Sequence, residues 1–219
     1  LPYKPDTMTA PAFLFNGPKK STVTLAFAHG AGAAMDSDFM TYFAEALGEN
    51  GIRVARFEFP YMAKRREDGK KRPPDRTPAL LETWRAVIAE FGPNRCIVAG
   101  KSMGGRIASL VAAEMEAAKT PVLGAAYLGY PFHAPGKPMG SRDLPLGSMK
   151  TPTLLLQGER DTFGPRAELE KFKFGRRVKV AYLPDGDHSF VPRKSSGYTK
   201  EGNWNAAIEK IAGFIGGLK

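Results

Sequence analysis

The sequence has a single cysteine among 219 residues, Cys96, which excludes a disulfide within the chain. Disulfides are typical of secreted proteins, whereas free thiols persist in reducing compartments. The first six residues, Leu-Pro-Tyr-Lys-Pro-Asp, lack the apolar core of a secretory signal, although the chain begins without Met. We therefore expect a cytoplasmic protein. Cys96 stands in an apolar stretch, so we interpret it as a packed core residue and not as a reactive thiol.

The sequence is also poor in long apolar runs and in histidine. No stretch of 18 apolar residues occurs, so we expect no membrane-spanning helix and no membrane partner. The three histidines show no metal-ligand spacing such as His-x-x-x-His, so neither a metal nor another cofactor is expected. A dinucleotide fingerprint beginning at Gly30 fails, because Met35 stands at its third glycine position.

Acidic side chains are in deficit: 22 Asp and Glu face 32 Lys and Arg, which gives a net charge of +10. Part of this charge is concentrated in residues 64–76, which carry seven basic and three acidic side chains. Such a segment attracts anionic substrates or nucleic acid. No aromatic stacking platform or recognition motif accompanies it, so we expect no nucleic-acid partner. We predict a solvated loop that borders the active site, because it is long for a β–α connection.

The remaining composition is that of a globular protein, with 42% hydrophobic and 25% charged residues. Runs of strand formers alternate with segments whose apolar residues recur at helical spacing. We expect strands at 22–28, 52–59, 95–100, 122–128, 153–157 and 178–183, and helices at 36–46, 79–91, 103–118, 165–174 and 204–215. Residues 11–16 are interpreted as one arm of an edge hairpin leading into the first of these strands. The alternation predicts one α/β domain over residues 1–219, a mostly parallel sheet with helices on both faces and no large cap.

The stretch that carries the chemistry is Gly-Lys-Ser-Met-Gly, residues 100–104, between an apolar strand and a helical pattern. A serine at a strand–turn–helix corner, with small residues two positions away on each side, is typical of a nucleophile elbow. Gly105 lets the helix pack close to the strand, and the N–H of Met103 is expected to face a developing oxyanion. The same letters end a phosphate-binding loop, but that motif needs glycine where Arg95 stands.

A second small-residue loop, His-Gly-Ala-Gly at 29–32, follows the strand expected at 22–28. Small residues let backbone N–H groups approach a ligand closely. We expect the N–H of Ala31, with Gly32 as the alternative, to complete an oxyanion hole opposite Met103. We expect His29 to shape this loop and not to act as a base, and His133 to support the pocket. The residues expected to line the pocket are His29, Gly30, Gly32, Lys101 and His133.

Three further residue types complete the pattern. Ser102, Asp161 and His188 each follow a predicted strand, and the carboxyl ends of parallel strands share one edge of a sheet. A serine hydroxyl needs a base within hydrogen-bond reach, and the base needs an acid to orient it. We predict Ser102 as nucleophile, His188 as base and Asp161 as acid. Asp185 and Asp187 are alternative acids, but they stand so close to His188 in sequence that a well-aimed bond to its ring is harder.

These motifs resemble the α/β-hydrolase superfamily. More narrowly they resemble small, cap-less hydrolases related to dienelactone hydrolase, a group that includes a testis-expressed protein and a subunit of a histone-acetylating complex. The resemblance covers the chain roughly from Thr22 to the end and rests on residues 29–32, 100–106, 130–138, 157–161 and 186–190. It implies an α/β-hydrolase fold and a Ser-His-Asp triad. It implies no particular substrate.

We therefore predict a serine hydrolase that cleaves a carboxylic ester or a related acyl compound through an acyl-enzyme. Its expected partner is a small acyl substrate, neutral or anionic, and the basic segment at 64–76 would act as a partial lid that favours anionic substrates. Two alternatives stay open: a thioesterase or peptidase with the same triad, and a binding scaffold that has the fold without the activity.

Overall fold

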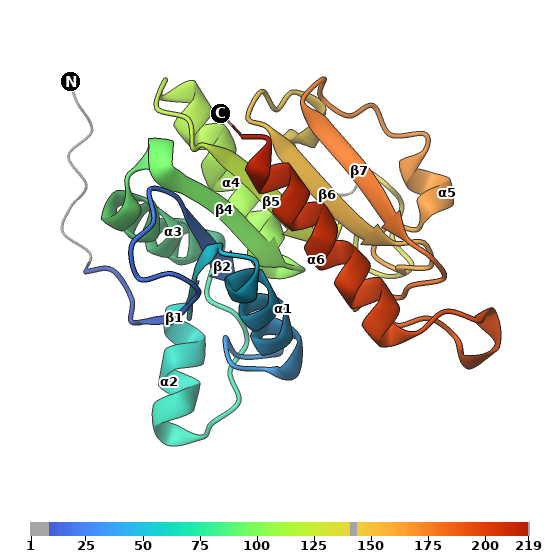
Figure 1. Ribbon diagram of the computed structural model, residues 1–219, viewed down its shortest axis with the longest axis horizontal. Coiled ribbons are helices and arrows are strands. Elements are labelled where there is room, and N and C mark those ends of the chain that lie inside the picture. The colour runs from blue at the N-terminus through green and yellow to red at the C-terminus, as the bar shows by residue number, and fades with distance from the viewer. Residues whose placement is uncertain (1–8, 141–143, 219) are drawn as a thin grey trace.

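A seven-stranded sheet lies at the centre of the computed structural model, which describes residues 9–140 and 144–218 (Figure 1). The strands are β1 Phe13–Asn16, β2 Thr24–Ala28, β3 Arg53–Phe57, β4 Cys96–Lys101, β5 Gly124–Leu128, β6 Thr153–Gly158 and β7 Val178–Leu183. They follow the order β1-β3-β2-β4-β5-β6-β7 across the sheet. Within the described residues only β1 is antiparallel to its neighbour, so the sheet is mostly parallel, as predicted.

Helices cover both faces of the sheet. They are α1 Asp38–Glu49, α2 Pro60–Asp68, α3 Thr77–Phe91, α4 Met103–Ala117, α5 Arg166–Leu169 and α6 Lys200–Gly216. In Figure 1, α1 and α6 lie in front of the sheet, α3 and α4 lie behind it, and α2 projects away from it. The described residues include no large cap, and the predicted α/β-hydrolase architecture is confirmed.

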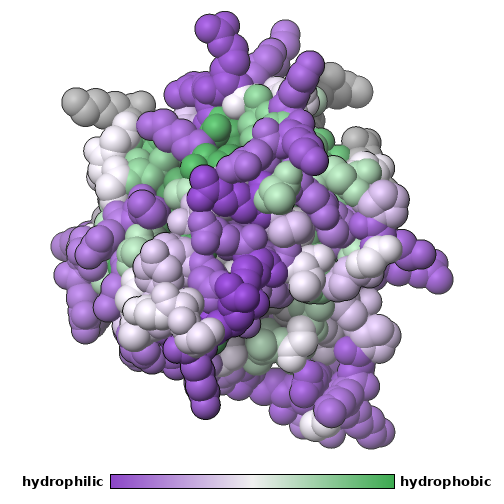
Figure 2. All heavy atoms as spheres, turned by 90° about the vertical axis from the view of Figure 1, so that its right-hand side faces the viewer, coloured by the Kyte–Doolittle hydropathy of each residue, from purple (hydrophilic) through white to green (hydrophobic). Residues whose placement is uncertain are grey.

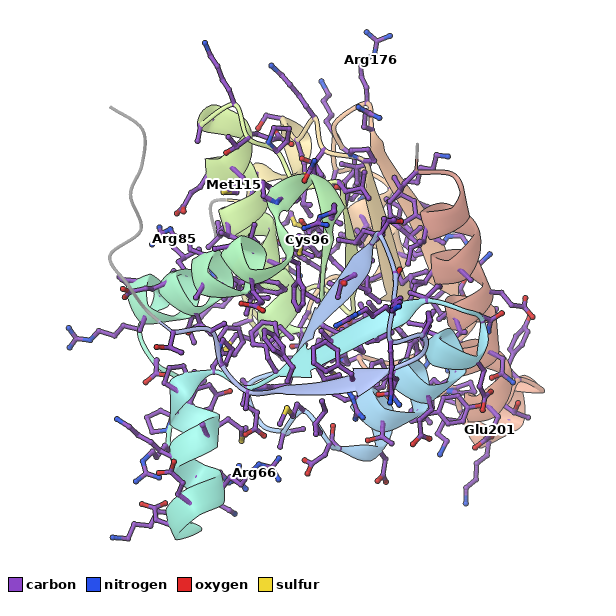
Figure 3. All side chains as sticks on the ribbon, turned by 60° about the vertical axis from the view of Figure 1, so that its left-hand side comes forward. Arg66, Arg85, Cys96, Met115, Arg176 and Glu201 are labelled. Carbon is purple, nitrogen blue, oxygen red and sulfur yellow. The ribbon has the colours of Figure 1, made fainter. Side chains whose placement is uncertain are left out.

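The central strands β2, β4 and β5 are buried along their whole length and mostly apolar, because helices cover them from both sides. In β4, Ile97 and Ala99 face the cluster that α1 and α6 complete, whereas Cys96 and Val98 face the cluster of α3 and α4. Cys96 is fully buried, as expected, and Figure 3 places it inside the molecule. The site therefore rests on a strand that is clamped between two hydrophobic layers.

The expected edge hairpin is wrong, because β1 does not pair with the strand that follows it. β2 lies between β3 and β4, so both of its edges are occupied, and β1 adds to the outer edge of β3. Side chains favour that edge: the Phe13 ring packs against Phe57 and Phe91, and Arg56 Nη2 donates to Asn16 Oδ1 at 3.0 Å. These partners lie far from β1 in sequence.

Two expected segments also differ from the structure. Residues 64–76 were expected to form a loop, but 64–68 belong to α2, which begins at Pro60; proline fits the first helical position because the N–H it lacks has no partner there. The helix expected at 165–174 is confined to α5. After it, Phe172 and Phe174 both pack on the Phe132 ring, and two side chains at that spacing cannot share one face of a helix.

The outer edge of the sheet at β7 is polar. Figure 2 views this side of the molecule, and hydrophilic residues cover most of it, with smaller hydrophobic patches between them. The β7 strand itself exposes Lys179, and a charged side chain on an edge strand opposes pairing with another chain. No helix among the described residues is long and apolar enough to cross a membrane.

Candidate active site

Ser102 occupies a strained corner between β4 and α4. Its backbone angles are φ 52° and ψ −119°, a conformation that residues with a side chain rarely adopt. Such strain is tolerated because glycines surround the corner: a Cβ on Gly100 would lie 2.4 Å from backbone atoms of residues 104 and 105, and one on Gly105 would lie 2.6 Å from the Gly100 oxygen. The corner holds the Ser102 side chain at the carboxyl edge of the sheet, as the elbow motif predicts.

The structure brings Ser102, His188 and Asp161 together in one hydrogen-bonded row. Ser102 Oγ lies 2.8 Å from His188 Nε2, and His188 Nδ1 lies 2.8 Å from Asp161 Oδ2. Because Asp161 can only accept when ionised, the ring carries its proton on Nδ1, and Nε2 is left to accept from the serine hydroxyl. These residues come from three loops that are separated by dozens of positions in sequence.

Asp161 is fully buried, and its oxygens are held by three donors. Besides His188, Gln157 Nε2 donates to Oδ2 at 2.9 Å, and the Phe163 N–H donates to Oδ1 at 2.9 Å. The Phe163 ring also packs on the imidazole of His188, with 4.4 Å between ring centres. The same short turn therefore fixes both the carboxylate and the plane of the histidine ring.

The two alternative acids bind elsewhere. Asp185 accepts from the Arg193 guanidinium at 2.6 Å and pairs with Arg160 at 3.0 Å, and the bond to Arg193 lowers the pKa of Asp185 to about 2. Asp187 accepts from the N–H groups of Ser189 and Val191 at 2.8 and 2.9 Å. Asp187 therefore closes the turn that carries His188, and Asp185 ties the start of that turn to Arg193.

The turn that carries His188 is held by side chains at three consecutive carbonyls. Lys101 Nζ donates to the His188 oxygen at 2.6 Å, Trp204 Nε1 to the Ser189 oxygen at 2.9 Å, and Asn203 Nδ2 to the Phe190 oxygen at 2.8 Å. Lys101 is buried, and burial lowers its pKa to about 8. It therefore lies under the histidine turn, and its expected place in the pocket lining stays a prediction.

The loop at 29–32 lies beside Ser102. A Cβ on Gly30 would sit 3.6 Å from Ser102 Cβ, so the two loops touch. Ala31 is exposed, and the N–H of Met103 is the first amide of α4, which has no acceptor within its own helix. These are the two amides that the sequence assigned to the oxyanion hole.

His29 and Tyr61 hold the loop from beneath. His29 Nδ1 donates to the Gly30 oxygen at 2.7 Å, while Nε2 accepts from the Phe59 N–H at 3.2 Å, which requires the neutral ring. Burial lowers the pKa of His29, in agreement with that form. The Tyr61 hydroxyl lies 3.3 Å from the Gly30 oxygen and 3.0 Å from the Ala31 oxygen; burial raises its pKa, so it stays a donor.

His133 lies away from the row of Ser102, His188 and Asp161. Its ring Nε2 contacts Glu168 Oε2 at 2.9 Å, and its ring Nδ1 contacts the Ala134 oxygen at 2.9 Å. Its backbone N–H donates to the Phe163 oxygen at 3.2 Å. Because Phe163 packs on His188, His133 supports the site indirectly, through Phe163.

The basic segment contacts the site through α2. Arg66 binds Asp36 through two 2.8 Å bonds and Glu58 through bonds of 2.7 and 3.1 Å, and the first of these carboxylates has a lowered pKa for that reason. Figure 3 labels Arg66 beside α2. The N–H of Tyr61 donates to Asp75 at 2.9 Å, so both ends of the segment are anchored.

Sequence reasoning missed Gln157, Tyr61 and Glu58. Each follows an apolar run and is buried, and a buried polar side chain requires partners. That rule marks them as structural supports, but it does not say which loop they support. Within residues 9–140 and 144–218, no three His, Cys, Asp or Glu side chains are grouped so that they could hold a metal ion.

The elbow, the buried acid and the sheet order together define an α/β hydrolase. The sequence matches the model of the alpha/beta hydrolase domain over residues 21–216, so the chain belongs to that family. This confirms the wider resemblance that the sequence motifs suggested. The narrower resemblance, to the group related to dienelactone hydrolase, stays a prediction. The comparison with curated proteins found no match.

Solved structures share the fold at low sequence identity. An alpha-beta serine hydrolase homologue from Coxiella burnetii is 19% identical, with a TM-score of 0.64, and the match covers 97% of this chain and 99% of that one. Est1E from Butyrivibrio proteoclasticus with ferulic acid bound is 16% identical, with a TM-score of 0.66 over 94% and 95% of the chains. A monoacylglycerol lipase of Paleococcus ferrophilus is 15% identical, with a TM-score of 0.65 over 94% and 100%.

Proposed function

We propose that this protein is a serine hydrolase that cleaves a carboxylic ester through a covalent acyl-enzyme. The observation that carries the proposal is the continuous row from Ser102 Oγ through the His188 ring to the buried Asp161. A serine hydroxyl is a weak nucleophile near neutral pH, and this row is the arrangement that activates it. The same fold carries a monoacylglycerol lipase, which is consistent with an ester substrate.

In the first half of the reaction, Ser102 Oγ attacks the ester carbonyl carbon while its proton passes to His188 Nε2. Asp161 accepts from Nδ1 and stabilises the imidazolium that forms. The N–H groups of Ala31 and Met103 bind the oxyanion of the tetrahedral intermediate. Collapse of that intermediate breaks the bond to the alkoxy oxygen, which leaves as the alcohol with the proton from His188.

In the second half, His188 removes a proton from water, and the resulting hydroxyl attacks the acyl-enzyme carbonyl. Collapse returns the proton to Ser102 Oγ and releases the carboxylic acid. Because the described residues include no large cap over this edge of the sheet, the site suits small or exposed acyl groups.

Replacing Ser102 by alanine tests the proposal. We expect turnover of p-nitrophenyl acetate and butyrate to fall by at least about 1,000-fold, since the remaining groups bind but do not attack. A fluorophosphonate probe should label the wild type at Ser102 and leave the variant unlabelled. Circular dichroism and thermal unfolding should be unchanged, as Ser102 is replaced by a smaller residue.

Turnover that survives in the Ser102→Ala protein would overturn the proposal. A thioesterase or peptidase would give labelling at Ser102 with faster turnover of thioesters or amides than of esters. A wild-type protein that stays unlabelled and binds nucleic acid in a salt-sensitive manner would instead indicate the scaffold alternative.

A further inference from the structure

A hollow opens directly beside the loop that carries Ala31. Its volume is about 220 Å³, and it lies between the 29–36 loop and α2. Gly32 and Ala34 form one wall, Met62 is an apolar patch on the other, and four charged side chains complete the lining: Asp36, Glu58, Arg65 and Arg66. Pockets for drug-sized ligands usually exceed about 300 Å³, so this one suits a short chain.

Three of the four charged side chains satisfy one another. Arg66 makes four hydrogen bonds to Asp36 and Glu58, so both carboxylates already have a cationic partner. Arg65 is the exception. Among the described residues, the Arg65 side chain has no hydrogen-bond or ion-pair partner, although it is only partly exposed. Its guanidinium can present two parallel N–H donors to a planar anion.

The hollow and Ser102 lie along one loop, residues 29–36, and Tyr61 supports that loop. The Tyr61 hydroxyl donates to the Ala31 oxygen at 3.0 Å, and the positive charge of Arg65 is close enough to oppose the rise in the pKa of Tyr61. Gly30, two positions before Gly32, touches Ser102. The loop that lines the hollow at Gly32 therefore lies against Ser102 at Gly30.

We propose that Arg65 binds the free carboxylate of the substrate, so that the preferred substrates are monoesters of short dicarboxylic acids. This inference rests on the proposed function and names its substrate class. The ester carbonyl lies at Ser102, the connecting methylene groups pass Gly32 and Met62, and the distal carboxylate meets Arg65. The neighbouring Lys70 and Lys71 add a positive field that draws such anions toward the hollow.

Matched methyl esters test the assignment by methanol release. The monomethyl esters of malonate, succinate, glutarate and adipate are compared with neutral methyl esters of equal chain length. We expect a higher kcat/KM for the anionic ester at one preferred length. The Arg65→Gln variant should lower the ratio of anionic to neutral kcat/KM by about 10-fold or more, since a charge-assisted pair is lost. Arg65→Lys should recover part of that loss.

Lys64→Gln is the matched control, because it removes one positive charge from the same helix at a residue outside the lining. We expect its ratio to stay within about twofold of the wild type, as an exposed charge contributes through the screened field alone. An equal loss in both variants, or no loss in Arg65→Gln, would overturn the assignment. A preference for a choline ester over the monoanionic esters would overturn it as well, because the carboxylates would then be the binding groups.

Direct binding separates this inference from the proposed function. Isothermal titration of glutarate into the Ser102→Ala protein measures the hollow without any turnover. We expect saturable binding that is lost in the Ser102→Ala/Arg65→Gln protein. Ester turnover that depends on Ser102, combined with glutarate binding unaffected by Arg65→Gln, would overturn the carboxylate site and leave the hydrolase intact. Arg65-dependent glutarate binding without any ester turnover would support the carboxylate site and overturn the proposed hydrolase activity.

Discussion

Lys101 and His188 are joined by a 2.6 Å hydrogen bond from the lysine ammonium to the histidine backbone carbonyl, so the residue before Ser102 holds the turn that carries His188. The same ammonium lies 5.5 Å from the centre of the Phe39 ring. One buried side chain therefore positions the Ser102 corner and the His188 turn against each other. A change at Lys101 should alter catalysis without touching any group that takes part in the reaction.

Lys101→Met keeps the length of the side chain and removes its donor. We expect kcat to fall by about 10-fold with KM little changed, because the histidine turn loses one of its three side-chain anchors. Esterase kinetics on p-nitrophenyl butyrate measure this split. Lys179→Met, on the exposed edge strand β7, removes the same group from the surface and should leave both constants unchanged. Equal effects in the two variants would contradict the positioning role.

The lowered pKa of Lys101 also predicts how stability varies with pH. The ordinary lysine value is 10.5, and burial lowers it to about 8 in the folded protein, so the unfolded chain binds more protons between these values. Stability contributed by this site therefore rises as the pH increases from about 8 to 10.5. The free energy of unfolding of the wild type relative to Lys101→Met should increase by up to about 1.4 kcal/mol per pH unit in that window. Urea unfolding at pH 7.5 and 9.5 measures it, and a constant difference would contradict the assignment.

Tyr61→Phe should weaken the oxyanion hole. The variant removes only the hydroxyl that binds the Gly30 and Ala31 carbonyls, so the loop loses two hydrogen bonds and keeps its packing. We expect kcat to decrease by about 10-fold, whereas KM changes less. Tyr42→Phe is the control, since it removes a hydroxyl that binds Asn205 at 2.7 Å on the far side of α1. A loss of kcat in the control alone would refute this role for Tyr61.

Asp161→Asn and Asp185→Asn together distinguish Asp161 from Asp185 as the acid. The amide preserves the shape of the carboxylate but turns one oxygen into a donor, which favours the wrong tautomer of His188. We expect kcat to fall by about 1,000- to 10,000-fold. Asp185→Asn breaks the pairs with Arg160 and Arg193 and should change stability more than kcat. If the kinetic losses are reversed between these two variants, Asp185 is the acid.

Gly104→Ala should prevent the elbow from closing. A Cβ there would lie 2.5 Å from the His29 oxygen and 2.7 Å from the Ala28 oxygen, and backbone atoms cannot move away as a flexible side chain can. We expect a loss of at least about 2 kcal/mol in the free energy of unfolding, together with a loss of labelling at Ser102. Gly213→Ala in α6 meets no atom within 4 Å and should instead stabilise the protein by up to about 1 kcal/mol. Thermal and urea unfolding measure both.

Local patterns are sufficient for the sheet because the central parallel strands are buried on two faces and each covering helix on one. The elbow at residues 100–104 and the loop at 29–32 could also be predicted from the sequence, because the backbone geometry of each segment itself requires glycine at fixed positions. The pairing of strands and the side-chain contacts that anchor loops could not be predicted from local patterns. The partner of β1 depends on β2 having no free edge, and the roles of Tyr61 and Gln157 depend on loops that meet only after folding.

The structure of the basic segment at 64–76 also depends on contacts that the local sequence does not reveal. Charge composition predicted a solvated loop, because Lys and Arg are usually exposed and proline often ends a helix. In the structure, Pro60 begins α2, and the exposed Arg66 binds Asp36 and Glu58. No count of charges distinguishes an arginine that has found two carboxylates from one that has found none. That difference separates Arg66 from Arg65.

The burial of Cys96 has a practical consequence for spectroscopy. Its thiol is enclosed between β4 and the α3–α4 layer, and burial raises its pKa to about 12, so very little thiolate is present near neutral pH. The folded wild-type protein should therefore resist maleimide reagents without any substitution. A single cysteine introduced on the exposed side of α2 would then carry the one fluorophore or spin label in the molecule, and its signal would report on the hollow as substrate arrives.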